Sequence, residues 1–60
     1  MSYDVKAIQT GLNKAGFGPI SVDGNIGPRT LAAIKAFQAK NNLMPDGKVG
    51  PKTAAKLIPA

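Results

Sequence analysis

The 60-residue chain carries eight Lys or Arg and three Asp, for a formal net charge of +5, and it contains no Cys, His or Glu. These absences exclude disulfides, thiolate sites, catalytic triads and the common zinc sites, and we expect neither a metal nor a cofactor. The length allows one small domain, residues 1–60, which buries only about 60% of its unfolded surface. The basic balance favours an anionic partner such as nucleic acid, phospholipid or an anionic cell wall.

The first predicted helix covers residues 4–15. Ser2 or Asp4 can cap its first turn, and Gly16 fits a left-handed exit with Phe17 folding back as the apolar contact. Gly11 lies in the middle of this helix, where a close approach by another segment would explain it. The apolar residues recur at intervals of three, four and three, which places them on one helical face: Val5, Ile8, Leu12 and Ala15.

The segment 17–26 is predicted to be a loop that packs against the core. A polar linker would not carry four large apolar side chains, so we expect these to point inward: Phe17, Ile20, Val22 and Ile26. Asp23 and Gly24 are typical of a tight turn.

Two further helices are predicted over residues 28–41 and 51–58. Pro28 and Pro51 each suit a first helical position, because proline has a helical φ and lacks the N–H that would be unpaired there. Asn41-Asn42 can supply a left-handed exit, and Met44-Pro45-Asp46-Gly47 is typical of a turn. The expected inward residues are Leu31, Ile34 and Phe37 in the first of these helices, and Ala54, Leu57 and Ile58 in the second.

One phrase occurs twice in the chain: DGNIGPRT at 23–30 and DGKVGPKT at 46–53. A weaker echo precedes each copy, AIQ at 7–9 and AFQ at 36–38, and the first loop is longer than the second. Each of the two repeat units therefore consists of a helix, a loop and the start of the next helix. The middle helix belongs to both units. The sequence predicts an all-α fold, a small three-helix bundle with an internal pseudo-duplication.

The repeated phrase is interpreted mainly as scaffold. The glycines suit a positive φ or a close approach, the aspartates suit Asx turns, the threonines can satisfy free helix donors, and Ile26 and Val49 can anchor the loops in the core. The structural positions are Asp23, Gly24, Gly27 and Pro28, with Asp46, Gly47, Gly50 and Pro51 in the second copy. A catalytic carboxylate pair is disfavoured because both acids lie in solvated turns among lysines, and calcium or phosphate loops would need further residues.

At this point the residues resemble a known family. Gln9, Leu12-Asn13 and Gly16-Phe17, followed by VDGNIGPRTLAAIKAFQ and LMPDGKVGPKTAAKL, resemble the peptidoglycan-binding domain of bacterial and phage cell-wall enzymes from about residue 5 to 58. The resemblance implies a three-helix fold and a non-catalytic module that binds peptidoglycan and tethers a hydrolase to the bacterial wall.

The expected ligand contacts are polar. The chain has no Trp and only three aromatic residues, so no stacking platform for a sugar can be identified. The candidate binding residues are Asn13, Asn25, Arg29 and Thr30. We expect Gly24→Val or Gly27→Val to unfold the domain, and Arg29→Ala to leave it folded but weaken wall binding.

The parent protein is a further expectation. The Met1 start without a signal peptide suggests the N-terminal module of a phage endolysin, made in the host cytoplasm and acting at the cell wall. Residues 59–60 read as the start of a linker to a lytic domain. We expect a monomer that binds neither a membrane nor nucleic acid. The alternative is a small basic helical nucleic-acid-binding domain, which the scattered positive charges disfavour.

Overall fold

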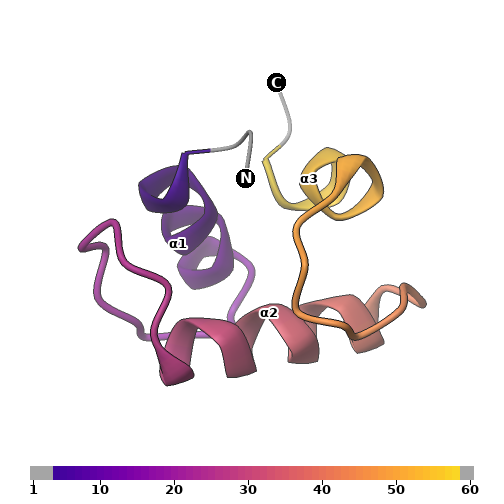
Figure 1. Ribbon diagram of the computed structural model, residues 1–60, viewed down its shortest axis with the longest axis horizontal. Coiled ribbons are helices and arrows are strands. Elements are labelled where there is room, and N and C mark those ends of the chain that lie inside the picture. The colour runs from indigo at the N-terminus through magenta and orange to yellow at the C-terminus, as the bar shows by residue number, and fades with distance from the viewer. Residues whose placement is uncertain (1–3, 59–60) are drawn as a thin grey trace.

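Three helices make up the fold. The computed structural model describes residues 4–58, and it places α1 at Val5–Lys14, α2 at Pro28–Lys40 and α3 at Pro51–Leu57. No strand occurs within that range, so the predicted all-α class is confirmed, and each helix boundary agrees with the prediction to within one residue. α1 contacts both α2 and α3, and the two connecting loops lie at opposite ends of α2 (Figure 1). The expected linker at 59–60 lies outside the described residues.

The helices begin in two different ways. Asp4 caps α1, because its side chain accepts the amide N–H of Lys6 at 3.2 Å, whereas the alternative cap, Ser2, lies outside the described residues. The N-cap residues of α2 and α3 are Gly27 and Gly50, which have an extended backbone and supply no side-chain cap. A proline follows each of them. Both prolines therefore occupy the first helical position, as predicted.

α1 and α2 end in the same motif. Gly16 has φ +89°, and the amide of Phe17 donates to the carbonyl five residues earlier at 2.9 Å. Asn42 has φ +59°, and the amide of Leu43 makes the equivalent bond at 2.8 Å. These bonds satisfy the last carbonyls of each helix and turn the chain sharply into the following loop.

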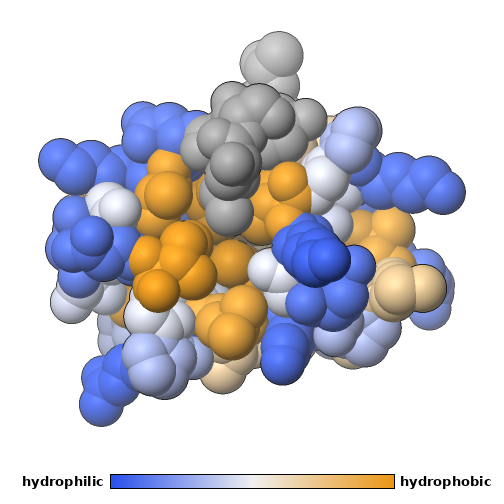
Figure 2. All heavy atoms as spheres, in the orientation of Figure 1, coloured by the Kyte–Doolittle hydropathy of each residue, from blue (hydrophilic) through white to orange (hydrophobic). Residues whose placement is uncertain are grey.

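The core lies where the three helices meet, and it consists of Ile8, Leu12, Ala33, Ile34, Phe37, Val49, Ala54 and Leu57. Phe17 packs edge-on against Phe37 with ring centroids 5.6 Å apart. Figure 2 shows apolar residues gathered in the centre of one face, flanked on both sides by hydrophilic ones. No helix among residues 4–58 is long and apolar enough to cross a membrane.

Three apolar side chains lie further out than predicted. Val22 and Ile26 are 43% and 39% exposed, and Leu31 is also exposed, whereas Ile20 packs against the core as expected. The first loop forms an outer edge of the molecule with no helix beyond it (Figure 1). Val49, which corresponds to Ile26 in the second copy, is buried.

The glycines of the repeat divide into two kinds. Gly24 and Gly47 have φ +82° and +76°, so they do require the left-handed region. Gly27 and Gly50 have ordinary extended backbones, and an added Cβ would meet nothing within 4 Å, so their predicted need for positive φ or close approach is wrong. The expectation that Gly27→Val unfolds the domain loses its basis for the same reason. The prediction for Gly11 is confirmed, because an added Cβ there would lie 2.5 Å from a backbone carbonyl of α3.

Candidate binding grooves at the loop-to-helix joints

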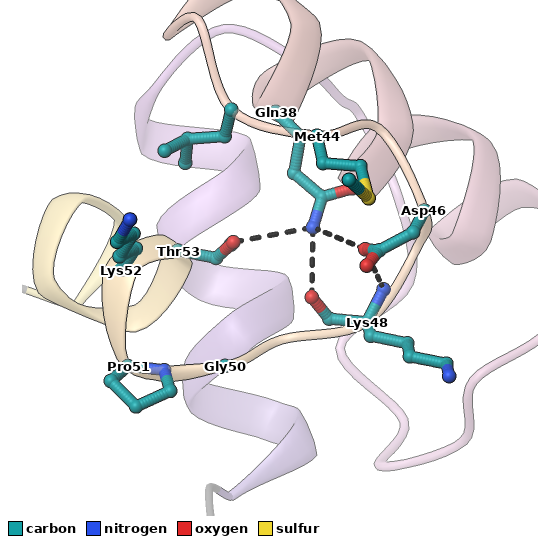
Figure 3. Close-up of a pocket in the computed structure, with 9 residues that line it drawn as sticks. Gln38, Met44, Asp46, Lys48, Gly50, Pro51, Lys52 and Thr53 are labelled. Atoms are coloured by element: carbon teal, nitrogen blue, oxygen red, sulfur yellow. Dashed lines mark hydrogen bonds between the residues drawn. The ribbon is translucent and has the colours of Figure 1, made fainter.

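A buried glutamine organises the second copy of the repeat. Gln38, on α2, is 1% exposed. Its Nε2 lies 2.8 Å from the carbonyl oxygen of Lys48, 3.2 Å from Thr53 Oγ1 and 3.2 Å from Asp46 Oδ1, while its Oε1 accepts the Gly47 N–H at 2.9 Å (Figure 3). Because an amide nitrogen carries two hydrogens, three acceptors share two donors. One side chain thus joins the turn, the loop and the start of α3.

The first copy has the same arrangement around Gln9 of α1, which is fully buried. Gln9 Nε2 lies 2.9 Å from the Asn25 carbonyl oxygen, 3.0 Å from Asp23 Oδ1 and 3.3 Å from Thr30 Oγ1, and Oε1 accepts the Gly24 N–H at 3.0 Å. We call each set a glutamine hub. Among residues 4–58, every buried side-chain nitrogen or oxygen has a hydrogen-bond partner.

The two repeat aspartates, Asp23 and Asp46, accept hydrogen bonds from the hub glutamines. Asp23 Oδ1 accepts the Asn25 amide at 2.9 Å, and Asp46 Oδ1 accepts the Lys48 amide at 2.9 Å, so both form the expected Asx turns. These backbone hydrogen bonds are the main cause that lowers the pKa of Asp23 and of Asp46 below the usual range, and the glutamine amides add to the effect. A general acid would need the opposite shift.

The four candidate ligand residues occupy different environments. Asn13 pairs with the backbone of Ile20, its Nδ2 donating at 3.0 Å and its Oδ1 accepting at 2.8 Å. Thr30 is buried, and its hydroxyl accepts a hydrogen bond from Gln9 Nε2 instead of capping α2. Asn25 and Arg29 are exposed. The structure therefore brings Asn25, Arg29 and Thr30 together at the start of α2, and a ligand-binding role for the four stays a prediction.

Residues of each hub line a groove. The C-terminal groove has a volume of about 360 Å³ and is lined by the side chains of Leu43, Met44, Asp46, Lys48, Pro51 and Lys52 above the second hub. The N-terminal groove has a volume of about 180 Å³ and is lined by Ile20, Ser21, Asp23, Asn25, Pro28 and Arg29 above the first hub.

The C-terminal groove combines apolar surface with positive charge. Met44 is 75% exposed and stands beside the partly buried Leu43. Lys48 and Lys52 are exposed and lie on opposite sides of the hub amide in Figure 3. Such a surface suits a ligand that has both an apolar part and an anionic group. No group of three acidic, His or Cys side chains that could hold a metal occurs within the described part of the chain.

Sequence reasoning missed the hubs and the larger groove. Gln9 and Gln38 were recognised as a weak echo upstream of each repeat and as part of the family motif, but no structural role was predicted for them. Lys48 and Lys52 stand 23 positions after Asn25 and Arg29, so the duplication itself could have identified them once the first pair had been chosen.

Comparison with known proteins places the chain in a family. Residues 2–57 match the family described as "Putative peptidoglycan binding domain". The chain is 54% identical over 55 residues to the "Uncharacterized protein in bpoA1 3'region" of Kitasatospora aureofaciens, a match that covers 88% of this chain and 46% of that protein. The chain thus spans about half the length of this relative, and no solved structure matches it significantly. The resemblance stated from the motifs is confirmed: the chain belongs to the family of peptidoglycan-binding domains.

Proposed function

We propose that this domain binds peptidoglycan through the C-terminal groove and holds an attached lytic enzyme at the bacterial cell wall. Membership of the family supports peptidoglycan as the ligand. The single observation that carries the choice of surface is the groove, in which Met44 and two exposed lysines surround a rigid hub.

The chemistry of the groove favours the peptide part of the wall. Stem peptides carry carboxylates and small apolar side chains, which Lys48, Lys52 and Met44 can contact. A sugar ring would favour an exposed aromatic face, but no aromatic side chain among residues 4–58 lines either groove, because Phe17 and Phe37 pack on each other. We therefore assign the stem peptide, and its carboxylates in particular, as the moiety recognised.

The role in the parent protein is non-catalytic. Backbone hydrogen bonds in the Asx turns lower the pKa of both repeat aspartates, which is the opposite of what a general acid needs, and the remaining acid of the described range, Asp4, caps α1. A lytic activity would belong to a further part of the polypeptide, as in a phage endolysin. The domain would then act as a monomer that raises the local concentration of the enzyme at the wall.

Retention on purified, protein-free sacculi tests this function. The wild type should be retained at low and at moderate salt, because contacts within the groove add to the long-range attraction of a +5 domain. Lys52→Ala should weaken retention, whereas Lys56→Ala removes the same charge from an exposed position of α3 outside the groove and should have little effect. Release at moderate salt together with equal retention on DNA would favour the nucleic-acid alternative.

A further inference from the structure

We infer that the domain carries two pseudo-equivalent subsites, one in each groove, which hold two stem peptides of the wall. This inference rests on the proposed function. Its basis is a correspondence between the grooves: each of the eight residues that line the N-terminal groove has its counterpart, 23 positions later, among the residues that line the C-terminal groove. The duplication therefore repeats the cavity as well as the scaffold.

The hubs do not account for everything that is repeated. A hub uses the glutamine, the aspartate, the glycine amide, the threonine hydroxyl and the backbone carbonyl of Asn25 or Lys48. Arg29 and Lys52 are exposed, occupy equivalent positions and take no part in either hub. Both lie in the first turn of a helix, where the helix dipole disfavours a positive charge, and neither first turn contains an acid. Because the helix dipole does not favour a cation at these two places, we assign the pair to ligand carboxylates.

The lysine stems extend the equivalence to the two tight turns. A methyl group at Gly24 would lie 3.4 Å from Lys6 Cε, and one at Gly47 would lie 3.3 Å from Lys35 Cε. Lys6 and Lys35 each precede the hub glutamine of their helix by three residues. The lysine stem of each repeat thus lies beside the turn of that repeat.

The two subsites differ in strength. Lys48 and Lys52 against Asp46 give the C-terminal groove a formal charge of +1, whereas Arg29 against Asp23 gives the N-terminal groove 0. Exposed Met44 also corresponds to Ser21. The C-terminal subsite should therefore bind a carboxylate-bearing peptide more tightly and with the larger dependence on salt.

The spacing of the subsites suits a repeating polymer. Thr30 lines one groove and Gln38 lines the other, and eight residues of α2 separate them by a rise of about 12 Å. One short peptide fills one groove, while a wall with many stem peptides can engage both. Two weak contacts on one rigid domain then give stronger retention than either alone.

Titration of the 15N-labelled chain with a soluble disaccharide-tetrapeptide, released from sacculi by a muramidase, tests the inference. We expect two molecules bound per domain and two sets of shifted amide resonances, one at 43–52 and a weaker one at 20–29. Arg29→Ala should abolish only the second set, and Lys52→Ala only the first. Lys56→Ala, the control, should change neither.

A gain-of-function variant sharpens the test. Asn25 stands where Lys48 stands in the other copy, and its hub contacts come from its backbone. Asn25→Lys should therefore leave the hub intact and tighten the N-terminal subsite by roughly two- to five-fold. Lys48→Asn should weaken the C-terminal subsite by a similar factor.

The outcomes separate the two proposals. Saturation with one molecule and one set of shifts, in a domain that sacculi still retain, would overturn the two-subsite inference and leave the proposed function standing. Equal weakening by Lys56→Ala and Lys52→Ala would overturn it as well, because bulk charge would then explain binding. No shifts and no retention on sacculi would remove the proposed function itself.

Discussion

Replacing Gln38 with alanine removes the centre of one glutamine hub. The Gly47 amide, the Lys48 carbonyl and the buried Thr53 hydroxyl would lose their partner together. A buried polar group without a partner costs about 1–3 kcal/mol, and water entering the groove would compensate part of that, so we expect a total loss of about 2–4 kcal/mol.

That loss is large for a domain of this size. At roughly 0.05–0.15 kcal/mol per residue, the whole chain is stabilised by only about 3–9 kcal/mol. In a small domain each kcal/mol lowers the melting temperature by about 4–8 °C, so Gln38→Ala should lower it by at least about 10 °C. Thermal melts followed by circular dichroism measure this. Lys40→Ala, at an exposed position near the end of the same helix, is the matched control and should change little.

A second substitution at the same position tests the hub by its pH dependence. Gln38→Glu keeps the shape but places a carboxyl oxygen near Asp46 Oδ1 and the Lys48 carbonyl. In the folded variant, the pKa of the new carboxyl group should rise above its value of about 4.3 in the unfolded chain. The contribution of this group to the free energy of unfolding is therefore present below about pH 4.3 and is lost as the pH rises through the folded pKa. The variant should be least destabilised, relative to the wild type, near pH 4. An ordinary surface substitution shifts the melting temperature by roughly 2–3 °C. If Gln38→Ala melts within about that range of the wild type, the hub account is refuted.

Three other predictions concern the turns and their charges. Gly47→Ala should cost about 1–3 kcal/mol, because φ is +76° and the new Cβ would lie 2.6 Å from Leu31 Cδ1; urea unfolding measures this, and a neutral result would contradict the turn geometry. Gly27→Ser should stabilise by a few tenths of a kcal/mol, because Gly27 is an uncapped, extended N-cap with open space around it; a melt below that of the wild type would contradict this. Because the pKa values of Asp23 and Asp46 are lowered in the folded state, the contribution of these aspartates to the free energy of unfolding is complete above about pH 4. It is lost as the pH falls through their folded pKa values. Melts from pH 7 to 2.5 should show that loss, and the double Asp→Asn variant should show a flatter profile.

The helices could be predicted because their signals are local. Each boundary depends on residues within a few positions, such as Pro28 at a first helical position or Gly16 and Asn42 at left-handed exits. Such preferences act through the backbone of the residue itself, so they survive without knowledge of the tertiary structure.

The burial of side chains depends on distant partners, so prediction succeeded for helix residues such as Ile34 and Phe37 but failed for others. Gln9 and Gln38 are polar, yet they are buried because the following loop and the start of the next helix supply their side-chain hydrogen bonds. Ile26 is apolar, yet it is 39% exposed, in a loop that forms an outer edge of the molecule (Figure 1). Neither outcome can be deduced from composition or periodicity within one element.

The candidate site was predicted in part. Arg29 and Asn25 were selected from the first copy of the repeat, and the structure places both on a groove. The larger groove depends on Met44, Lys48 and Lys52, whose convergence is set by the hub that fixes the second loop. The duplication pointed to equivalent positions, but only the folded loops bring those side chains into one cavity.

The most direct test of wall binding through the grooves is retention on protein-free sacculi of two double variants that have the same net charge. Arg29→Ala with Lys52→Ala removes one cation from each groove, whereas Lys40→Ala with Lys56→Ala removes two exposed cations outside both grooves. We predict that at moderate salt the groove variant is released while the control variant stays bound like the wild type. Equal retention of both variants, or equal release of both, would contradict binding through the grooves.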